Sequence, residues 1–140
     1  MGLHFDPIII YDGFEKDYEY LIKDLSRMLD LDRVIWVSLG LLRFPPGLYY
    51  RFLEEGRGNL LAGEFVRGED GKYRYIKKER TRVYSMLYDM LKGCNPDLFV
   101  YFCMERSDIW ERVAGMRLNS SEDLMDLFDM RTKKLYGGAL

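Results

Sequence analysis

The stretch LHFDPIIIYDGFEKDY, residues 3–18, combines the two kinds of element from which most of the chain is built. Its first part is a short, isoleucine-rich apolar run, which is typical of a strand buried on both faces. Asp12 and Gly13 interrupt the run. Apolar side chains then recur on one face of an expected helix, namely Phe14, Tyr18, Leu21, Ile22, Leu25, Met28 and Leu29. The stretch therefore predicts a strand over residues 3–11 that leads into an amphipathic helix.

The same alternation of strand and helix continues to the end of the chain. Two further buried strands are predicted over residues 34–39 and 98–103. Two short runs flank a Gly-Glu-Asp-Gly turn and predict a β-hairpin over about residues 63–76. The remaining helices are expected over residues 48–55 and 78–92, from Asp108 onward, and over residues 121–128. A flexible tail is expected over residues 131–140.

This order of elements predicts an α/β fold with about three parallel strands, flanking helices and an inserted β-hairpin. A parallel sheet of three strands leaves one face and both edges without a cover, which is unfavourable for an isolated domain. We therefore expect the chain either to pair with a second copy of itself or to complete a larger structure.

Composition excludes several classes of protein. The chain of 140 residues is 48% hydrophobic and 31% charged, as in a globular domain. Its formal net charge of -2 predicts no general affinity for polyanions. Two cysteines are too few for a secreted disulfide framework. No apolar run is long enough for a membrane span, and the first residues do not have the pattern of a signal peptide. We expect a cytoplasmic protein without a membrane partner.

Four motifs resemble, in order, segments of spore photoproduct lyase and its radical-SAM relatives. In residues 5–18, a Pro-Ile step is followed by an acidic-Gly-aromatic-Glu turn, as after a central barrel strand of that family. Residues 35–44 resemble the next strand and its Arg-Phe exit, and residues 71–75 resemble the Gly-Lys-Tyr-x-Tyr arm of the family's hairpin. Residues 95–102 resemble its closing proline turn and strand. The resemblance covers roughly residues 3–115.

The resemblance implies that residues 1–130 form the carboxy-terminal half of a partial (β/α) barrel. It also implies S-adenosylmethionine and a [4Fe–4S] cluster as cofactors of the complete protein. The family holds its cluster with a Cys-x3-Cys-x2-Cys loop, whereas Cys94 and Cys103 have eight residues between them and no third cysteine is present. We therefore expect this chain alone to bind no metal or cofactor, to contain no catalytic residue and to be inactive by itself.

Candidate site residues lie where predicted strands end, because active sites of (β/α) barrels form at the carboxyl ends of the strands. His4 and Asp6 are candidates for the rim beside S-adenosylmethionine, or else they fill the barrel interior and satisfy local amides. Arg43 is held near the same rim by the prolines that follow it. Its guanidinium suits a phosphate or carboxylate of the substrate, or else a neighbouring acid. Glu105, after the third strand, is a further candidate substrate contact.

The hairpin carries a basic run with tyrosines between the cations. Residues 72–82 contain six Lys or Arg residues and one acid, Glu79. Alternation along the strand places Lys72 and Arg74 on one face and Tyr73 and Tyr75 on the other. Such a ribbon can contact a nucleic-acid backbone and insert between bases. In spore photoproduct lyase the corresponding hairpin enters the DNA. The alternative is an ordinary solvated hairpin.

Three hypotheses of function follow. The chain is a fragment or split subunit of a spore-photoproduct-lyase-like radical-SAM protein of the DNA-repair lyase type, and its partner is the missing amino-terminal half of the barrel. Alternatively, it is a non-catalytic module that binds nucleic acid, with DNA as the expected partner, through the basic hairpin. The third hypothesis is a structural α/β domain that forms a homodimer.

Overall fold

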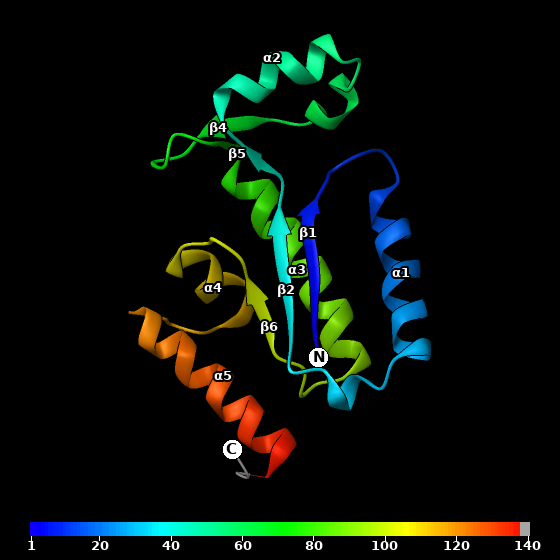
Figure 1. Ribbon diagram of the computed structural model, residues 1–140, viewed down its shortest axis with the longest axis vertical. Coiled ribbons are helices and arrows are strands. Elements are labelled where there is room, and N and C mark those ends of the chain that lie inside the picture. The colour runs from blue at the N-terminus through cyan, green and yellow to red at the C-terminus, as the bar shows by residue number, and fades with distance from the viewer. Residues whose placement is uncertain (138–140) are drawn as a thin grey trace.

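The computed structural model describes residues 1–137, which form two small sheets and five helices (Figure 1). The larger sheet consists of β1 (Gly2–Ile8), β2 (Trp36–Leu41) and β6 (Val100–Phe102), with β2 in the centre. All three strands are parallel. The α/β fold with three parallel strands, flanking helices and a hairpin, which the alternating strands and helices predicted, is confirmed.

The first predicted strand is shorter than the apolar run suggested. β1 ends at Ile8, where the pairing partner is Leu41 of β2. The register shifts between Phe5 and Ile8. Ile10 lies beyond the strand, and its backbone N–H donates to the hydroxyl of Tyr75 at 3.0 Å. The apolar character of residues 9–11 therefore reflects packing against the second sheet and not a continued strand.

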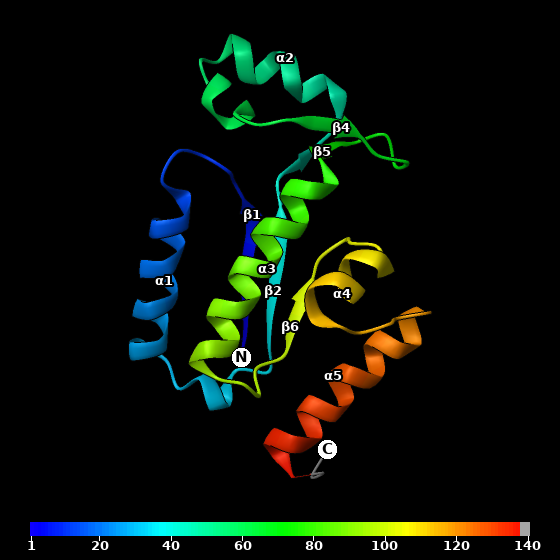
Figure 2. The ribbon, with the colours of Figure 1, turned by 180° about the vertical axis from the view of Figure 1, so that it is seen from behind.

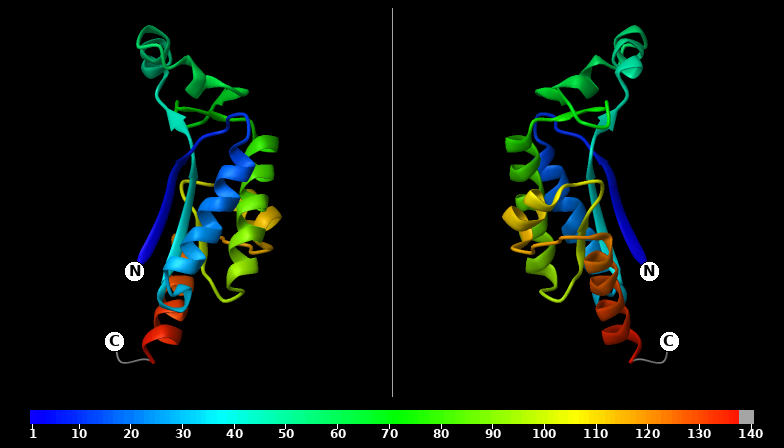
Figure 3. Two further views of the ribbon diagram at one scale, coloured as in Figure 1. Left: turned by 90° about the vertical axis from the view of Figure 1, so that its right-hand side faces the viewer. Right: turned by 90° about the vertical axis from the view of Figure 1, so that its left-hand side faces the viewer.

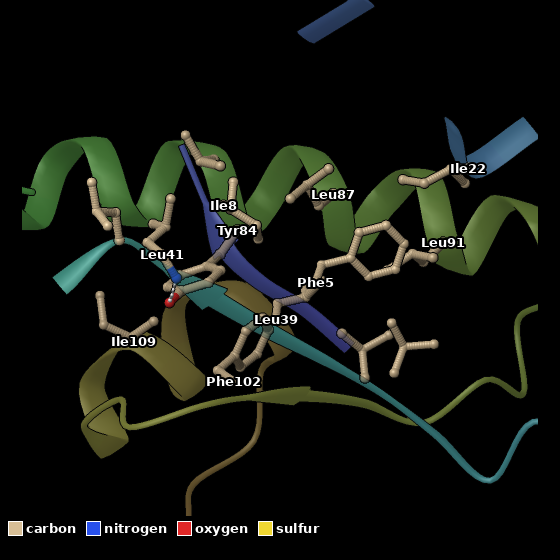
Figure 4. Close-up of a cluster of buried hydrophobic side chains, with 14 of the residues drawn as sticks. Phe5, Ile8, Ile22, Leu39, Leu41, Tyr84, Leu87, Leu91, Phe102 and Ile109 are labelled. Carbon is tan, nitrogen blue, oxygen red and sulfur yellow. Dashed lines mark hydrogen bonds between the residues drawn. The ribbon is translucent and has the colours of Figure 1, made fainter. Parts of the chain in front are cut away.

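One face of the parallel sheet is covered by α1 (Phe14–Met28), α3 (Lys77–Cys94) and α4 (Ser107–Ala114), as Figures 2 and 3 show. The strands contribute Phe5, Ile8, Leu39, Leu41 and Phe102 to the core, and the helices contribute Ile22, Tyr84, Leu87, Leu91 and Ile109 (Figure 4). Buried Tyr84 also accepts the backbone N–H of Leu41 at 3.1 Å. This bond satisfies a donor at the carboxyl end of β2, so it ties α3 to the place where the central strand ends.

The opposite face of the parallel sheet carries different residues. His4 lies opposite Ser38, which in turn lies opposite Tyr101. The side chains of His4 and Asp6 are exposed there. β1 is also an edge strand, with β2 as its neighbour on one side only. Within residues 1–137, the edge of β1 and the part of this face around it are uncovered, as the sequence suggested, whereas the ring of Phe128 packs on Trp36 and Tyr101 of the same face.

The second sheet is antiparallel and has the order β3-β5-β4. The predicted hairpin is formed by β4 (Phe65–Arg67) and β5 (Tyr73–Tyr75). It is not a free-standing ribbon, however, because β3 (Arg43–Phe44) pairs with β5 and makes it the central strand. Helix α2 (Pro46–Glu54) and a 3-10 turn (Gly58–Leu61) connect β3 to the hairpin, and another 3-10 turn (Leu31–Arg33) precedes β2.

The last helix corrects the expected tail. α5 runs from Ser121 to Tyr136, well beyond the predicted end at residue 128. Arg131 is buried, and its Nη2 donates to the backbone oxygen of Val34 at 3.0 Å. The ring of Phe128 packs against Trp36, Phe99 and Tyr101 of the parallel sheet. Residues 131–136 therefore belong to the folded body, whereas residues 138–140 of the expected tail lie outside the described residues.

A search of residues 1–137 found no helix with the length and hydropathy of a membrane span.

Candidate functional site

The carboxyl ends of the parallel strands bring together Asp6, Arg43 and Cys103, which we call the rim cluster. Arg43 Nη2 lies 3.5 Å from Asp6 Oδ2 and 3.7 Å from the sulfur of Cys103. Arg43 Nη1 donates to the backbone oxygen of Leu41 at 3.4 Å. Asp6 lies near the end of β1, Cys103 directly follows β6, and Arg43 begins β3 two residues after β2 ends. They meet because β1, β2 and β6 are parallel and end at the same edge of the sheet. The structure thus places two of the predicted site residues, Asp6 and Arg43, in direct contact.

The rim cluster is partly buried. The side chains of Arg43 and Asp6 are 20% and 31% exposed. Together with Pro7, Leu42, Pro45 and Lys72 they line a cavity of about 300 Å³. Lys72 makes no ion pair within residues 1–137, so it adds a free cation to the cavity. A guanidinium and an ammonium beside one carboxylate can bind an anionic group such as phosphate or carboxylate.

His4 lies on the same strand as Asp6, toward its amino end. Its side chain is exposed, and its ring lies edge-on to Trp36 with the centroids 6.2 Å apart. Since residues two apart in a strand share a face, His4 and Asp6 point to the uncovered side of the sheet. The structure leaves His4 outside the rim cluster.

Glu105 does not lie on the rim as a substrate contact, which corrects the prediction. Its side chain is only 4% exposed, and one of its oxygens lies 3.0 Å from Arg80 Nε. Arg80 also donates to the backbone oxygen of Tyr75 at 2.7 Å. Burial raises the pKa of the Glu105 carboxyl, against the opposing effect of the Arg80 charge. The pair joins the end of β6 to α3 and acts within the protein interior.

Most of the basic run is neutralised by acids, some of them close in sequence and others distant. Arg74 pairs with Asp70 at 2.6 Å, and Lys77 pairs with Asp108. Arg82 pairs with both Glu15 and Glu79, as the structure places α1 beside α3. In this run only Lys72 and Lys78 lack an ion pair within the described part of the chain. The basic run is therefore much weaker as a nucleic-acid surface than its sequence suggests.

The two hairpin tyrosines differ from each other. Tyr75 is 0% exposed, and its ring stacks on Phe65 with the centroids 4.5 Å apart. A buried ring cannot contact a nucleic acid, so Tyr75 is removed from the set of predicted contacts. Tyr73 is half-buried, and its ring lies 5.8 Å from that of Phe44. Only Tyr73 presents part of its surface to a ligand.

Sequence reasoning missed two features. The first is Cys103, which the sequence offers only as one of two cysteines too few for a cluster, although it is half-buried and contacts Arg43. The second is an aromatic pocket between α2 and the antiparallel sheet, to which Tyr49 and Tyr50 contribute. The Tyr-Tyr pair was a visible signal for it, but the position of its partners Phe65 and Tyr73 depends on the sheet.

The residues present do not fit an iron–sulfur cluster. Cys94 ends α3 near the amino end of the parallel sheet, whereas Cys103 follows β6 at the carboxyl end. Within the described residues, no three His, Cys, Asp or Glu side chains lie together in a way that could hold a metal ion. The rim cluster offers S-adenosylmethionine only a partial fit. Asp6 and Arg43 bind each other, and within residues 1–137 no strand or helix encloses the site on the outer side of β1.

Comparison with known proteins agrees with the partial barrel. No family model and no curated protein matches the chain. Among solved structures, the chain is similar to structures of spore photoproduct lyase. A variant with bound AdoMet and dinucleoside spore photoproduct has a TM-score of 0.59 and 23% identity, and covers 72% of this chain. Another lyase structure, complexed with dinucleoside spore photoproduct, has a TM-score of 0.58 and 24% identity.

The chain spans about a third of the length of the lyase structures that it matches, since the match covers 33% of them. At this identity the similarity establishes the fold. The fold-level resemblance to the spore photoproduct lyase barrel, inferred from four ordered motifs, is confirmed.

Proposed function

We propose that this chain is one segment of a spore-photoproduct-lyase-like radical-SAM protein, whose remaining barrel strands come from another part of the same polypeptide or from a second one. The single observation that carries the proposal is the exposed edge and open face of β1. It is an edge strand of a parallel sheet, and its exposed His4 and Asp6 face the side that helices α1, α3 and α4 leave open. A further parallel strand added at this edge would continue the barrel.

The rim cluster supports the same proposal. Asp6 and Arg43 lie at the carboxyl ends of β1 and β2, the side on which (β/α) barrels build their active sites. In the assembled protein these two residues, with His4 toward the amino end of β1, would border the S-adenosylmethionine and substrate. The cysteine ligands of the iron–sulfur cluster, and the residue that donates a hydrogen atom in the radical reaction, would come from the remaining segment.

The second candidate is a nucleic-acid-binding module, and one observation favours it. Lys72 of the hairpin is a free cation next to the half-exposed Tyr73, and it shares a cavity with Arg43. Arg74 contributes little, because Asp70 holds it at 2.6 Å and its side chain is only 15% exposed. In this candidate the contact surface is therefore Arg43, Lys72 and Tyr73.

An experiment on complex formation distinguishes the two candidate functions. The chain is mixed with the amino-terminal part of a spore-photoproduct-lyase-like protein that carries the cysteine loop, and the solution mass and visible absorption are recorded. The expected result is a one-to-one complex with the brown absorption of an iron–sulfur cluster. The assembly proposal would be contradicted if the chain does not bind this partner, or if it forms a stable homodimer through β1.

Binding to DNA is measured separately on the chain alone. At low salt, Lys72→Ala is expected to weaken binding, and Lys133→Ala on the exposed surface of α5 is the matched control. The loss of one phosphate contact reduces the salt dependence as well as the affinity. A wild-type chain with no affinity for DNA at low salt would exclude the module.

A further inference from the structure

An aromatic pocket of about 550 Å³ lies between α2 and the antiparallel sheet, at the end of the molecule that stands above β1 and β2 in Figure 1. Its walls include Pro46, Tyr49 and Tyr50 of α2, Leu61 of the following turn, and Phe65 and Tyr73 of the sheet. This volume is in the range of pockets that bind small molecules. The pocket is separate from the rim cluster, although Pro45 and Pro46 connect the two.

The sheet provides a fixed wall of ring surfaces. Phe44 lies opposite Tyr73 in the β3–β5 pairing, and residues directly opposite in an antiparallel pair share a face. Buried Phe44 is 5.3 Å from the ring of Phe65 and 5.8 Å from that of Tyr73. Phe44 therefore holds both rings in place from beneath.

Helix α2 provides the exposed wall. Tyr49 and Tyr50 are 40% and 69% exposed, and their rings lie edge-to-face at 5.5 Å. Their exposure leaves them free to close on a ligand. A planar ligand can therefore lie between a supported wall and an adaptable one.

The side chains that line the pocket favour a ligand with a neutral ring and polar groups at its edge. No charged side chain lines the pocket. The hydroxyls of Tyr49, Tyr50 and Tyr73 make no hydrogen bond within residues 1–137. Each hydroxyl can both donate and accept. Nucleobases combine a flat ring with donors and acceptors at the edge, and they stack well on aromatic side chains.

One cation adjoins Tyr73 outside the pocket. Arg67 is paired with Tyr73 across the hairpin, so both side chains lie on the same face of the sheet. Arg67 is exposed, and it makes no ion pair in the described part of the chain. Lys72 lies on the other face, where it lines the cavity of the rim cluster. A base in the pocket would place its phosphodiester within reach of Arg67.

We propose that the aromatic pocket binds an unstacked nucleobase of single-stranded DNA, with Arg67 on an adjoining phosphate. The proposal extends the nucleic-acid contact suggested above for the hairpin and rests on that contact, but not on assembly with a barrel partner. Tyr49 and Tyr50 supply the ring faces that distinguish this site from simple attraction between charges.

The test is the binding of the full chain to a fluorescent oligothymidylate and to an abasic strand of equal length. Tyr49→Ala and Tyr50→Ala are expected to weaken binding of oligothymidylate on the order of tenfold each, with an unchanged salt slope. Arg67→Ala should lower that slope by about 0.7. Tyr20→Ala, an equally exposed tyrosine of α1, should have no effect. The abasic strand should bind on the order of tenfold more weakly to the wild type.

The outcomes separate the two ideas. If the tyrosine variants bind like wild type, or if the abasic strand binds as tightly as oligothymidylate, the pocket proposal is overturned while the hairpin contact stands. If wild type binds no DNA at low salt, both are overturned. Thermal unfolding of each variant shows whether a loss of binding comes from loss of fold. A folded Tyr50→Phe variant keeps the ring that stacks on the base, so its fluorescence response to oligothymidylate should match that of wild type.

Discussion

The carboxylate of Asp6 lies directly over Gly40 of the neighbouring strand. A β-carbon at residue 40 would be 2.7 Å from Asp6 Cγ, which is closer than side-chain carbons approach. The absence of a side chain at Gly40 therefore lets Asp6 lean across β2 toward Arg43. A contact at the rim thus depends on a glycine near the carboxyl end of the central strand.

Gly40→Ala should turn the Asp6 carboxylate away and break its contact with Arg43, while the fold remains. The stability cost should be about 1 kcal/mol, since a half-exposed ion pair contributes little. The NMR shift of the Arg43 side chain should change as it does in Asp6→Asn. Gly93→Ala is the control, because nothing lies within 4 Å of a β-carbon there. An Arg43 signal that stays in place in Gly40→Ala would show that the contact does not need the glycine.

Tyr84→Phe should destabilise the fold by about 1–3 kcal/mol. The variant removes the hydroxyl that accepts the backbone N–H of Leu41 and leaves this donor buried without a partner. The free energy of unfolding in urea measures the effect. Tyr88→Phe, on the same helix, is the matched control, because the Tyr88 hydroxyl makes no hydrogen bond within residues 1–137. Equal stability of the two variants would be inconsistent with a structural role for the Tyr84 hydroxyl.

Arg80→Ala should cost about 3–5 kcal/mol, since it leaves the Glu105 carboxylate buried and without its counter-charge. Arg82→Ala removes a similar side chain from an ion pair that is 45% exposed on both sides. Its cost should stay below about 1 kcal/mol. The comparison is made by urea unfolding at neutral pH. A loss of similar size in both variants would mean that burial does not strengthen the Arg80 pair.

The raised pKa of Glu105 predicts how stability changes with pH. A carboxyl whose pKa is higher in the folded state than in the unfolded state binds more protons when folded, so its contribution to stability falls as pH rises between the two values. The stability of wild type minus that of Glu105→Gln should therefore decline as pH rises above the ordinary carboxyl pKa of 4.5. A difference that is flat or increases with pH would contradict this sign.

Arg131→Ala should loosen α5 from the sheet. Its guanidinium donates to the backbone oxygen of Val34, and truncation leaves this buried acceptor unsatisfied at a cost of about 1–3 kcal/mol. Hydrogen exchange of α5 should accelerate more than that of α3. Lys133→Ala, on the exposed side of α5, should leave exchange unchanged. Unchanged hydrogen exchange of α5 in Arg131→Ala would contradict the role of the bond to Val34 in holding this helix.

Local pattern was sufficient for the elements themselves. Periodicity placed α1, α3 and the three parallel strands, and the Gly-Glu-Asp-Gly turn placed the hairpin, because each of these depends on neighbours in sequence. It failed for α5, whose carboxy-terminal half has exposed residues on most sides. That half is held by Arg131 and Val34, which are 97 residues apart. No local signal encodes such a contact.

By itself the sequence determined an α/β chain with parallel strands. Tertiary structure decided which of its charged and aromatic residues are available. It buried Tyr75 and Glu105, paired Lys77 and Arg82 with acids far along the chain, and assembled Asp6 with Arg43 and Tyr49 with Tyr73. The reason is physical. Secondary structure follows from spacing along the chain, whereas burial and ion pairing depend on which distant residues the packed sheets and helices bring into contact.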